Sequence, residues 1–391
     1  MPDRRPSTRS FRLMLIYQVT QHLPLYWPYM FVFVTSVRGL SAADFGLLKS
    51  IYYLAVMAAE VPLGVVADRL GRRTTLIAAA GANCAACVLY GAGSGFAVFA
   101  VAELLFALTT ALQSGADSAL LFDAYAADDR AHEFARAKGA VEASGLVVGT
   151  VAFSLAGLIV SADGDASLAY LLTGALSLAG GAAALALREP PPLTSGRVRS
   201  HVANALRDLV NTPGLISLVL YAALVYAAIR AANALVWNPV LANAGAPVGL
   251  YGVLTGAVSL IAALVAWRTD ALRRRLGARA LALLVALSLV GMYGVLALEP
   301  GLWSIPILVS HGLALGIAPV LIVDMMNRRI HASERRATML SFESMAQRGT
   351  YGVLVYVAAS ALDASSLPVV LLGFAALAAV PLLLAARLRG E

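Results

Sequence analysis

The chain has 391 residues, of which 60% are hydrophobic and only 13% are charged, with a formal net charge of +7. So little charge over this length excludes a soluble domain, because apolar runs of about 20 residues are typical of helices that cross a membrane. The positive charge does not indicate a nucleic-acid partner either. The arginines are spread among short loops and are not gathered on one face.

Twelve apolar segments follow one another along the chain, and each is long enough to cross a bilayer as a helix. We therefore predict an all-α membrane protein with twelve transmembrane helices. The predicted spans cover approximately residues 12–36, 43–67, 74–93, 96–124, 136–160, 167–187, 214–238, 247–267, 279–298, 302–326, 337–361 and 366–386.

One long polar connection, residues 189–213, divides these spans into halves of six. The run Pro190-Pro191-Pro192 ends the sixth span, because proline has no amide hydrogen and clashes with the preceding turn. Apolar and basic residues then alternate in a pattern that predicts a short amphipathic helix on the membrane surface. The predicted domains are an N-terminal six-helix bundle at 1–188, this linker, and a C-terminal six-helix bundle at 214–391.

The basic residues indicate the orientation in the membrane, because loops rich in lysine and arginine stay on the cytoplasmic side. The basic segments are the N-terminus, 68–73, 130–138, 188–207, 268–279, 328–336 and the C-terminal Arg387 and Arg389. The alternate loops 92–95, 161–166 and 239–246 contain neither lysine nor arginine. We predict a multi-pass protein of the cytoplasmic membrane with both termini in the cytoplasm. The basic residues outside this pattern are Arg38, Lys49, Arg230 and Arg348.

The loop after the second span carries the most specific pattern, Gly64-x-x-x-Asp68-Arg69-x-Gly71-Arg72-Arg73. This spacing resembles the loop signature between the second and third helices of the major facilitator superfamily. A loop that only sets orientation needs arginines, but it does not need an aspartate and two glycines at fixed positions.

The two halves repeat weakly, which extends the resemblance to the whole chain. Residues 69–73 have a counterpart at 275–279, and the segment that ends at Asp123 is echoed by the one that ends at Asp324. Two parallel six-helix repeats are the architecture of major facilitators. The resemblance therefore implies two six-helix bundles that rock around a central site and give alternating access.

In this family the loop signature forms an ionic latch at the cytoplasmic face. The resemblance implies that the latch residues here are Gly64, Asp68, Arg69, Gly71, Arg72, Arg73, Asp123, Arg279 and Asp324. An arginine of the loop pairs with the acid on the fourth helix. The aspartate lies at the N-terminus of the eleventh helix, whose positive end favours an anion. The second copy pairs Arg279 with Asp324. The alternative is that these charges only anchor the loops.

Ionisable residues inside the spans are expensive and usually functional. Glu103 and Asp117 lie 14 residues apart in the fourth span, so 100° per residue returns them to nearly the same helix face. Glu142 and Glu343 occupy equivalent places in the two halves. These four are the predicted proton-coupling acids. Solvation at the outer surface is the alternative for Glu103, and a part in the latch is the alternative for Glu142 and Glu343.

Arg348 and Arg230 lie deep in the eleventh and seventh spans, and together with a polar side of the first span they form the predicted substrate site. The remaining predicted substrate residues are His22, Gln18, Gln21, Tyr26 and Trp237. An arginine fork suits a carboxylate or a phosphate of the solute. The alternatives are an ion pair between Arg348 and Asp117 or Glu343, snorkelling of Arg230 to the surface, and a place for the aromatics in the interfacial belt.

We predict a secondary transporter, not an enzyme, that moves a small organic solute with an anionic group. Proton coupling is expected because the chain has no G-x-x-x-x-G-K-[ST] loop for ATP, and sodium is the alternative ion. Export is the predicted direction, with proton-coupled uptake as the alternative. The rivals from other classes are a membrane-embedded enzyme and a sensor without transport. We expect a monomer in the lipid bilayer, with no cofactor and no metal.

Overall fold

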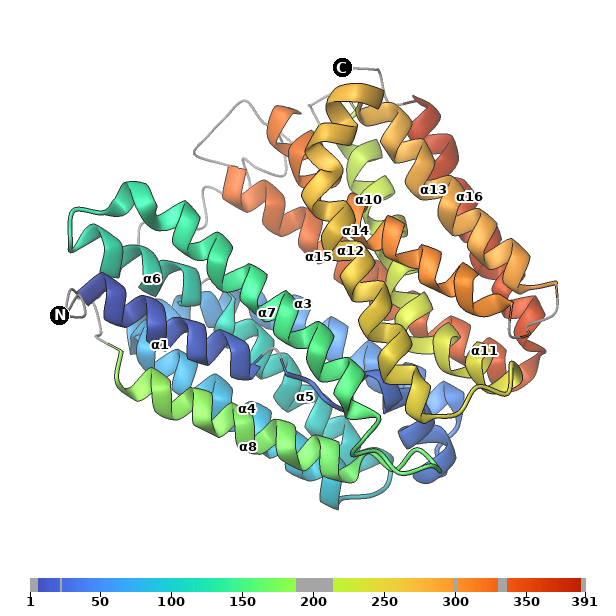
Figure 1. Cartoon of the computed structure of the whole chain (residues 1–391), viewed down its shortest axis with the longest axis horizontal. Coiled ribbons are helices and arrows are strands. Elements are labelled where there is room, and N and C mark those ends of the chain that lie inside the picture. The colour runs from blue at the N-terminus through green and yellow to red at the C-terminus, as the bar shows by residue number, and fades with distance from the viewer. Residues whose placement is uncertain are drawn as a thin grey trace. The chain divides into compact units, whose positions relative to one another are not determined.

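The computed structural model describes residues 6–21, 23–114, 116–187, 214–298, 301, 303–329 and 336–387. Within these ranges the side chains at positions 6, 7, 61, 64–69, 135, 142, 143, 146, 336–338 and 387 are left aside. The predicted linker at 189–213 lies outside the described residues. All of the regular structure in the described ranges is helical, as Figure 1 shows.

The chain divides into two compact units. The first unit comprises Met1–Leu40 and Ile51–Ser195, and the second comprises Ser41–Ser50 and Gly196–Glu391. The division falls inside one helix, α3 (Ala42–Leu70), whose first turns belong to the second unit and whose remainder belongs to the first.

The first unit is built around α4, which packs along α8 and along α5. On the other side α8 contacts α1, which also contacts α7 and α6. Besides part of α3, its helices are α1 (Pro6–Gln21), α2 (Met30–Val32), α4 (Arg72–Ala92), α5 (Phe96–Gln113), α6 (Ala116–Ala126), α7 (Phe134–Ala156) and α8 (Ser167–Leu185).

The second unit repeats this arrangement. Helix α13 packs along α16 and α14, and α10 packs along α16 and α15, so each pair matches a pair of the first unit. This equivalence agrees with the sequence repeat. The helices are α10 (Leu215–Ala231), α11 (Trp237–Asn243), α12 (Gly249–Leu276), α13 (Ala278–Leu296), α14 (Ser304–Arg329), α15 (Arg336–Ala364) and α16 (Leu367–Arg387).

Small residues allow α4 and α8 to approach closely, as is common between membrane helices. A Cβ atom on Gly174 would lie 3.0 Å from the Cβ of Cys87, and one on Gly181 would lie 2.9 Å from the Cβ of Ala80. Cys84 and Cys87 are both free cysteines, and Cys87 is buried. Their C-x-x-C spacing therefore serves helix packing in this unit.

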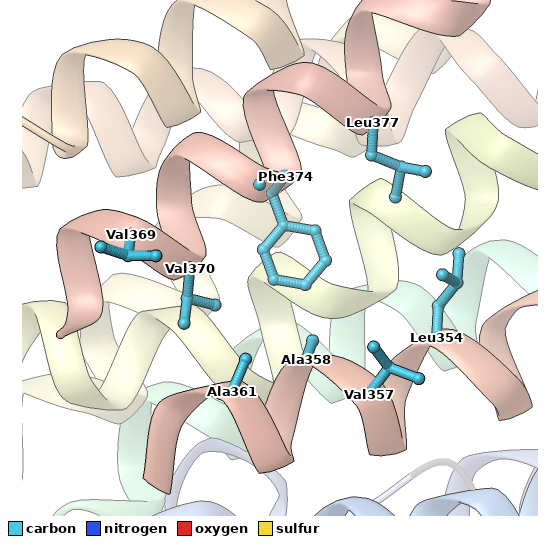
Figure 2. Close-up of a pocket in the computed structure, with 9 residues that line it drawn as sticks. Leu354, Val357, Ala358, Ala361, Val369, Val370, Phe374 and Leu377 are labelled. Carbon is cyan, nitrogen blue, oxygen red and sulfur yellow. The ribbon is translucent and has the colours of Figure 1, made fainter. Parts of the chain in front are cut away.

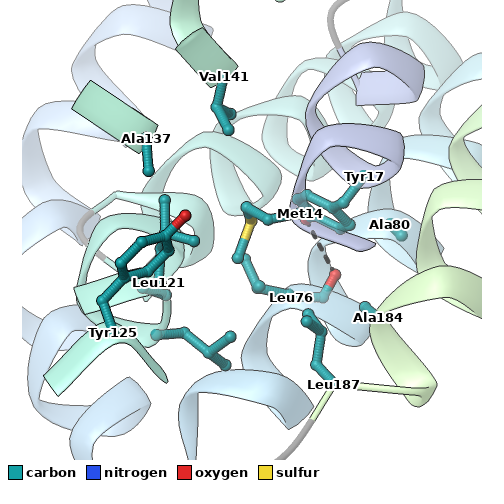
Figure 3. Packing of buried hydrophobic residues seen from close by; sticks show 12 residues of the cluster. Met14, Tyr17, Leu76, Ala80, Leu121, Tyr125, Ala137, Val141, Ala184 and Leu187 are labelled. Carbon is teal, nitrogen blue, oxygen red and sulfur yellow. Dashed lines mark hydrogen bonds between the residues drawn. The ribbon is translucent and has the colours of Figure 1, made fainter. Parts of the chain in front are cut away.

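A hydrophobic cluster closes the inner part of the first unit, where residues of five segments meet (Figure 3). Met14 and Tyr17 come from α1, and the hydroxyl of Tyr17 donates a hydrogen bond of 3.1 Å to the backbone carbonyl of Leu76 on α4. Leu121 and Tyr125 come from α6. The cluster fixes α6 and α7 against α1. Helix α6 carries Asp117, and α7 carries Lys138.

The first predicted span is not a continuous helix, and the seventh is continuous but changes its helical pitch. The first is interrupted after Gln21 and resumes only at a short 3-10 turn, Trp27–Tyr29. Pro24 and Pro28 explain the interruption, because a proline cannot donate the backbone hydrogen bond of a helix. In the seventh span a π-helical segment, Ala232–Val236, precedes Pro239 and accommodates the missing donor.

The fourth span is also broken, between α5 and α6. Ser114 ends α5 with ψ of 108°, which is not a helical value. The helical phase therefore does not run from Glu103 to Asp117, and the prediction that these acids share one face of one helix is wrong. Local backbone geometry at Ser114 overrides the apolar pattern on which the continuous span was based.

Nine helices in the described part of the chain are long and apolar enough to cross a membrane. They include α12, which continues to Leu276 instead of ending near residue 267. The all-α fold predicted from the sequence is confirmed by these helices and by the paired arrangement of the two units.

Candidate functional site

A hydrogen-bond network in the first unit joins the end of α5 to α1 and α8. The side-chain amide of Gln113 donates to the hydroxyl of Tyr17 at 3.1 Å and to the Gln21 side-chain oxygen at 3.3 Å. The Gln21 amide donates to the backbone carbonyl of Ser177 at 3.1 Å, and the Ser177 hydroxyl returns a bond of 3.0 Å. Gln21 therefore supports the packing of α1, and Gln18 beside it is buried.

A second polar strip follows the contact between α3 and α5. The hydroxyls of Tyr52 and Thr110 lie 2.9 Å apart, and the exposed Ser114 side chain donates to the carboxylate of Glu60 at 3.5 Å. Glu60 lies ten residues before the inner end of α3, about 15 Å along the helix. The strip brings a carboxylate and three hydroxyl groups to one side of the unit.

Glu103 lies in an aromatic box. The hydroxyl of Tyr90 donates a hydrogen bond to its carboxylate. The Tyr90 ring stacks between Phe99 and Tyr170, at centroid distances of 4.5 and 4.8 Å, and Tyr26 continues the stack at 4.0 Å from Tyr170. Glu103 is 1% exposed, so the alternative of solvation at the outer surface is wrong. Tyr26 is buried as well, and its ring supports the box around the carboxylate.

Asp117 lies in the first turn of α6 and forms an ion pair with Lys138 of α7. The Lys138 Nζ atom is 2.7 Å from Oδ2 of Asp117, and the backbone N–H of Ser118 donates to the other carboxylate oxygen at 2.6 Å. The N-terminal end of a helix also favours an anion. Asp117 is thus a paired acid.

The first turn of α4 and the last turn of α6 contain the expected pair between Arg72 and Asp123. Arg73 donates to the backbone carbonyl of Leu187 at 3.4 Å. In the loop after α6, Arg130 holds Glu133 with two bonds of 2.7 Å, and these bonds keep the pKa of Glu133 below its usual value. The ion pair is present, and its role as a gate stays a prediction.

The second unit pairs its inner charges differently from the predicted Arg279–Asp324 contact. Asp324 lies 2.9 Å from Arg328 and 3.5 Å from Arg273, whereas Arg279 donates to the backbone carbonyl of Ala386 at 2.6 Å. Helix packing gives the reason. Because α13 lies along α16, its first turn meets the end of α16, and α12 along α14 brings Arg273 to Asp324.

Arg230 and Arg348 belong to one helix pair, α10 and α15. The Arg230 guanidinium lies 5.3 Å from the centroid of the Tyr226 ring. The hydroxyl of Tyr351 donates to the backbone carbonyl of Arg230 at 3.4 Å, and its ring meets that of Tyr226 edge to face. Tyr351 follows Arg348 by three residues, which places both on one side of α15.

Glu343 is the buried acid of α15, with 6% of its surface exposed. It accepts a hydrogen bond from the side-chain amide of Gln347, and Arg348 is close enough to act on it electrostatically. The internal partner considered for Arg348 therefore lies on the same helix, little more than one turn away.

Trp237 is 4% exposed, so it does not stand in an interfacial belt. Its indole N–H has no hydrogen-bond acceptor among the described residues, and both ring nitrogens of the buried His311 likewise lack partners there. These polar atoms lie in the same unit as the two arginines.

An apolar groove of about 250 Å³ lies between α15 and α16 (Figure 2). Aliphatic side chains and Phe374 line it, and no predicted site residue is among them. The groove therefore does not hold the polar site.

Comparison with known proteins decides the family. The model of the Major Facilitator Superfamily matches residues 22–352, which is most of the chain. The chain belongs to the major facilitator superfamily. No curated protein matches its sequence.

Solved structures of this superfamily share the fold. The nucleoside transporter NupG aligns with a TM-score of 0.83 at 12% identity, over 97% of this chain and 98% of its own. A bacterial homolog of the human lysosomal transporter Spinster gives 0.77 at 17% identity, over 99% and 98%. A D-xylose-proton symporter gives 0.73 at 12% identity, over 97% and 95%. At these identities the likeness shows the fold alone.

Membership of the superfamily places this chain among multi-pass membrane proteins and points to a transporter and away from an enzyme. The predicted superfamily resemblance and fold are confirmed. The substrate, the coupling ion and the direction are matters for a proposal.

Some predicted site residues lie outside the described part of the chain. They are His22 and the side chains of Asp68, Arg69 and Glu142, while Gly64 of the loop signature is described by its backbone alone.

Sequence reasoning missed four residues of this superfamily member's polar network: Glu60, Tyr52, Gln113 and Lys138. Glu60 could have been found, because it is a carboxylate deep inside an apolar segment. Lys138 was counted only as a basic loop residue that sets orientation. Tyr52 and Gln113 gave no signal, since their roles depend on which helices meet.

Proposed function

We propose that this chain is a proton-coupled secondary transporter that moves a small organic solute with an anionic group across the cytoplasmic membrane by alternating access. The observation that carries the proposal is the placement of Arg230 and Arg348 on one helix pair, α10 and α15. Export is the direction we favour, and proton-coupled uptake is the alternative.

The charges along this helix pair favour an anion. Helix α10 carries Arg230 in its last turn, and α15 carries Arg348 and Glu343 in its interior. A guanidinium in the bilayer centre costs at least about 2.5–3.5 kcal/mol on insertion scales, so a compensating negative charge is favoured. A carboxylate or phosphate on the solute would supply such a negative charge beside the two arginines.

The surroundings of the arginines suit an organic body attached to such a group. The rings of Tyr226 and Tyr351 lie beside Arg230, and aromatic faces favour both a guanidinium and an apolar solute surface. An arginine fork can hold a carboxylate in two-pronged fashion, which lysine cannot do. The site is therefore suited to a compact solute with one anionic end.

Coupling to protons requires an acid that can exchange its proton during the cycle. Asp117 and Glu103 are the acids we favour, and Glu142 and Glu343 follow. Glu103 is buried beside Tyr90, and Asp117 is paired with Lys138 of the neighbouring helix. An aligned structure, the D-xylose-proton symporter, is described as proton-coupled, which agrees with the proposal without deciding it.

The test combines a ligand screen with one conservative variant. Purified protein is screened by thermal shift against organic anions, cations and neutral solutes, because a ligand of the folded state raises its stability. Hits are then measured for counterflow in liposomes. Arg348→Lys keeps the charge but loses the fork, so affinity for an anionic hit should fall by about ten-fold.

The matched control is Arg328→Lys, which alters an exposed ion pair at the inner end of α14 and should leave affinity unchanged. If all tight ligands are cations, or if Arg348→Lys has no effect, Arg348 serves as the partner of Glu343 and the anionic solute is rejected. A protein that transports no solute at all would favour the sensor or the enzyme.

A further inference from the structure

The inner end of α12 presents an exposed face with a regular order of side chains. Leu260 and Leu264 are 52% and 54% exposed, Trp267 is 74% exposed, and Arg268 and Arg275 are exposed beyond it. At 100° per residue these positions fall within roughly a quarter of the helix circumference. We call these five residues the α12 inner face.

The α12 inner face contains two arginines whose charge the described part of the chain does not neutralise. The acids nearby are engaged elsewhere, because Asp270 pairs with Arg274 and Asp324 pairs with Arg328. The Arg268 guanidinium lies 4.6 Å from the centroid of the Trp267 ring, and Arg275 makes no ion pair with a described residue.

We propose that the α12 inner face binds the headgroup of an anionic phospholipid in the cytoplasmic leaflet. The order of its residues matches the order of chemical groups across a leaflet. The leucines lie at the level of the acyl chains, a tryptophan marks the interface, and the arginines follow at the level of the phosphate. This rests on the orientation indicated by the basic loops, and it is independent of the transported solute.

The geometry allows both arginines to serve one headgroup. Arg268 and Arg275 are seven residues apart, about 10 Å along the axis. Side chains on a helix lean toward its N-terminus, so both arginines reach back toward the membrane, and their long side chains can meet at one headgroup between them. The Trp267 ring holds the Arg268 guanidinium at the interface through a cation–π contact. Both forks are then free to hold phosphate oxygens in two-pronged fashion.

Lipids with brominated acyl chains test the proposal, because bromine quenches a tryptophan that the chain touches. The full-length protein is placed in nanodiscs of neutral phosphatidylcholine, with a fixed fraction of brominated phosphatidylglycerol or brominated phosphatidylcholine. Subtracting the signal of Trp267→Phe isolates Trp267 from the other tryptophans. The anionic brominated lipid should quench Trp267 much more strongly than the neutral one.

Charge variants separate a defined site from a general attraction to the surface. Arg268→Gln and Arg275→Gln should each reduce the preference for the anionic lipid by about five-fold. The matched control Arg274→Gln removes the arginine that Asp270 already neutralises and should keep the preference. Equal quenching by both lipids overturns the proposal, and so does an equal loss in the Arg274→Gln control. Thermal unfolding of each variant identifies misfolded protein. If Arg268→Gln does not fold, Arg268→Lys is measured in its place, because it keeps the charge but loses the two-pronged contact with phosphate.

Discussion

Lys138 and Asp117 form an ion pair between α7 and α6, with 2.7 Å between Nζ and Oδ2. Their side chains are 23% and 15% exposed, so the pair is shielded from water but not sealed from it. Breaking a fully buried pair by removing one partner costs about 3–5 kcal/mol, and a pair with this exposure costs less. Because this exposure lowers the cost of separating the two side chains, the pair is the contact in the first unit at which the proposed coupling role of Asp117 is tested.

Replacing Asp117 tests its part in coupling. If Asp117 exchanges a proton during the cycle, Asp117→Asn should abolish accumulation driven by a pH gradient and retain counterflow, which needs no net proton movement. Lys138→Gln keeps the acid and should therefore retain accumulation. The matched control is Glu133→Gln, since Glu133 is an exposed acid paired with Arg130 nearby. Normal accumulation by Asp117→Asn would transfer the role to Glu103, Glu142 or Glu343.

The hydroxyl of Tyr90 should stabilise the first unit through Glu103. Tyr90→Phe keeps the stacked ring and removes one hydrogen bond from a buried carboxyl group, which should cost about 1 kcal/mol of unfolding free energy. Tyr170 offers a matched control, because it lies in the same stack and its buried hydroxyl has no partner among the described residues. Thermal unfolding in detergent should show a lower Tm for Tyr90→Phe and no loss for Tyr170→Phe. Equal losses in both variants would attribute the effect to ring packing.

The ion pair between Arg72 and Asp123 tests the predicted latch at the cytoplasmic face. Asp123→Arg should open the inner side and increase labelling of a reporter cysteine, Ser114→Cys, by a reagent added from the cytoplasm. The charge reversal Arg72→Asp in the same chain should restore the pair and lower the labelling. The native Cys84 is replaced by alanine in every variant, and Cys87 is buried. Unchanged labelling with full activity in Asp123→Arg would mean that the pair only anchors the loop.

The spans could be predicted because each apolar run is long enough to cross a membrane whatever its neighbours are. The break at Ser114 was missed although polar residues and Gly115 surround it, because the length of the whole apolar segment was given more weight than this short polar stretch. Pro24 and Pro28 did mark the break in the first span, but the length of the apolar run outweighed them in the prediction.

The partners of the charged residues could not be predicted from the sequence for a different reason. The repeat equates Arg279 with an arginine of the loop signature, but equivalent positions need not have equivalent partners. Arg279 donates to Ala386 because α13 packs along α16. The spacing of residues in the sequence does not indicate which helices pack together. The pairing of Lys138 with Asp117 could not be predicted for the same reason, because only the packing of α6 against α7 brings the two residues together.

The N-terminal end of α3 is fixed to α15 inside the second unit, and Asp363 is the residue that fixes it. Its two carboxylate oxygens accept hydrogen bonds from the backbone N–H groups of Ala42 and Ala43, at 3.1 and 2.7 Å. A local capping box already serves the same helix end. The N–H of Asp44 donates to the Ser41 hydroxyl at 2.9 Å, and the N–H of Ser41 donates to the Asp44 carboxylate at 3.1 Å. The second cap therefore joins two helices that are distant in the sequence.

Loss of this second cap should loosen the first turn of α3. Asp363→Ala removes the acceptors for two N–H groups at a helix N-terminus, where an anion is favourable, and should cost about 1 kcal/mol. Hydrogen exchange at Ala42 and Ala43 should then become about five-fold faster. Ser41→Ala, the matched control, weakens the local box and should change exchange mainly at Asp44. Unchanged exchange at Ala42 and Ala43 in Asp363→Ala would show that the local box alone holds the helix end, and that Asp363 does not fasten α3 to α15.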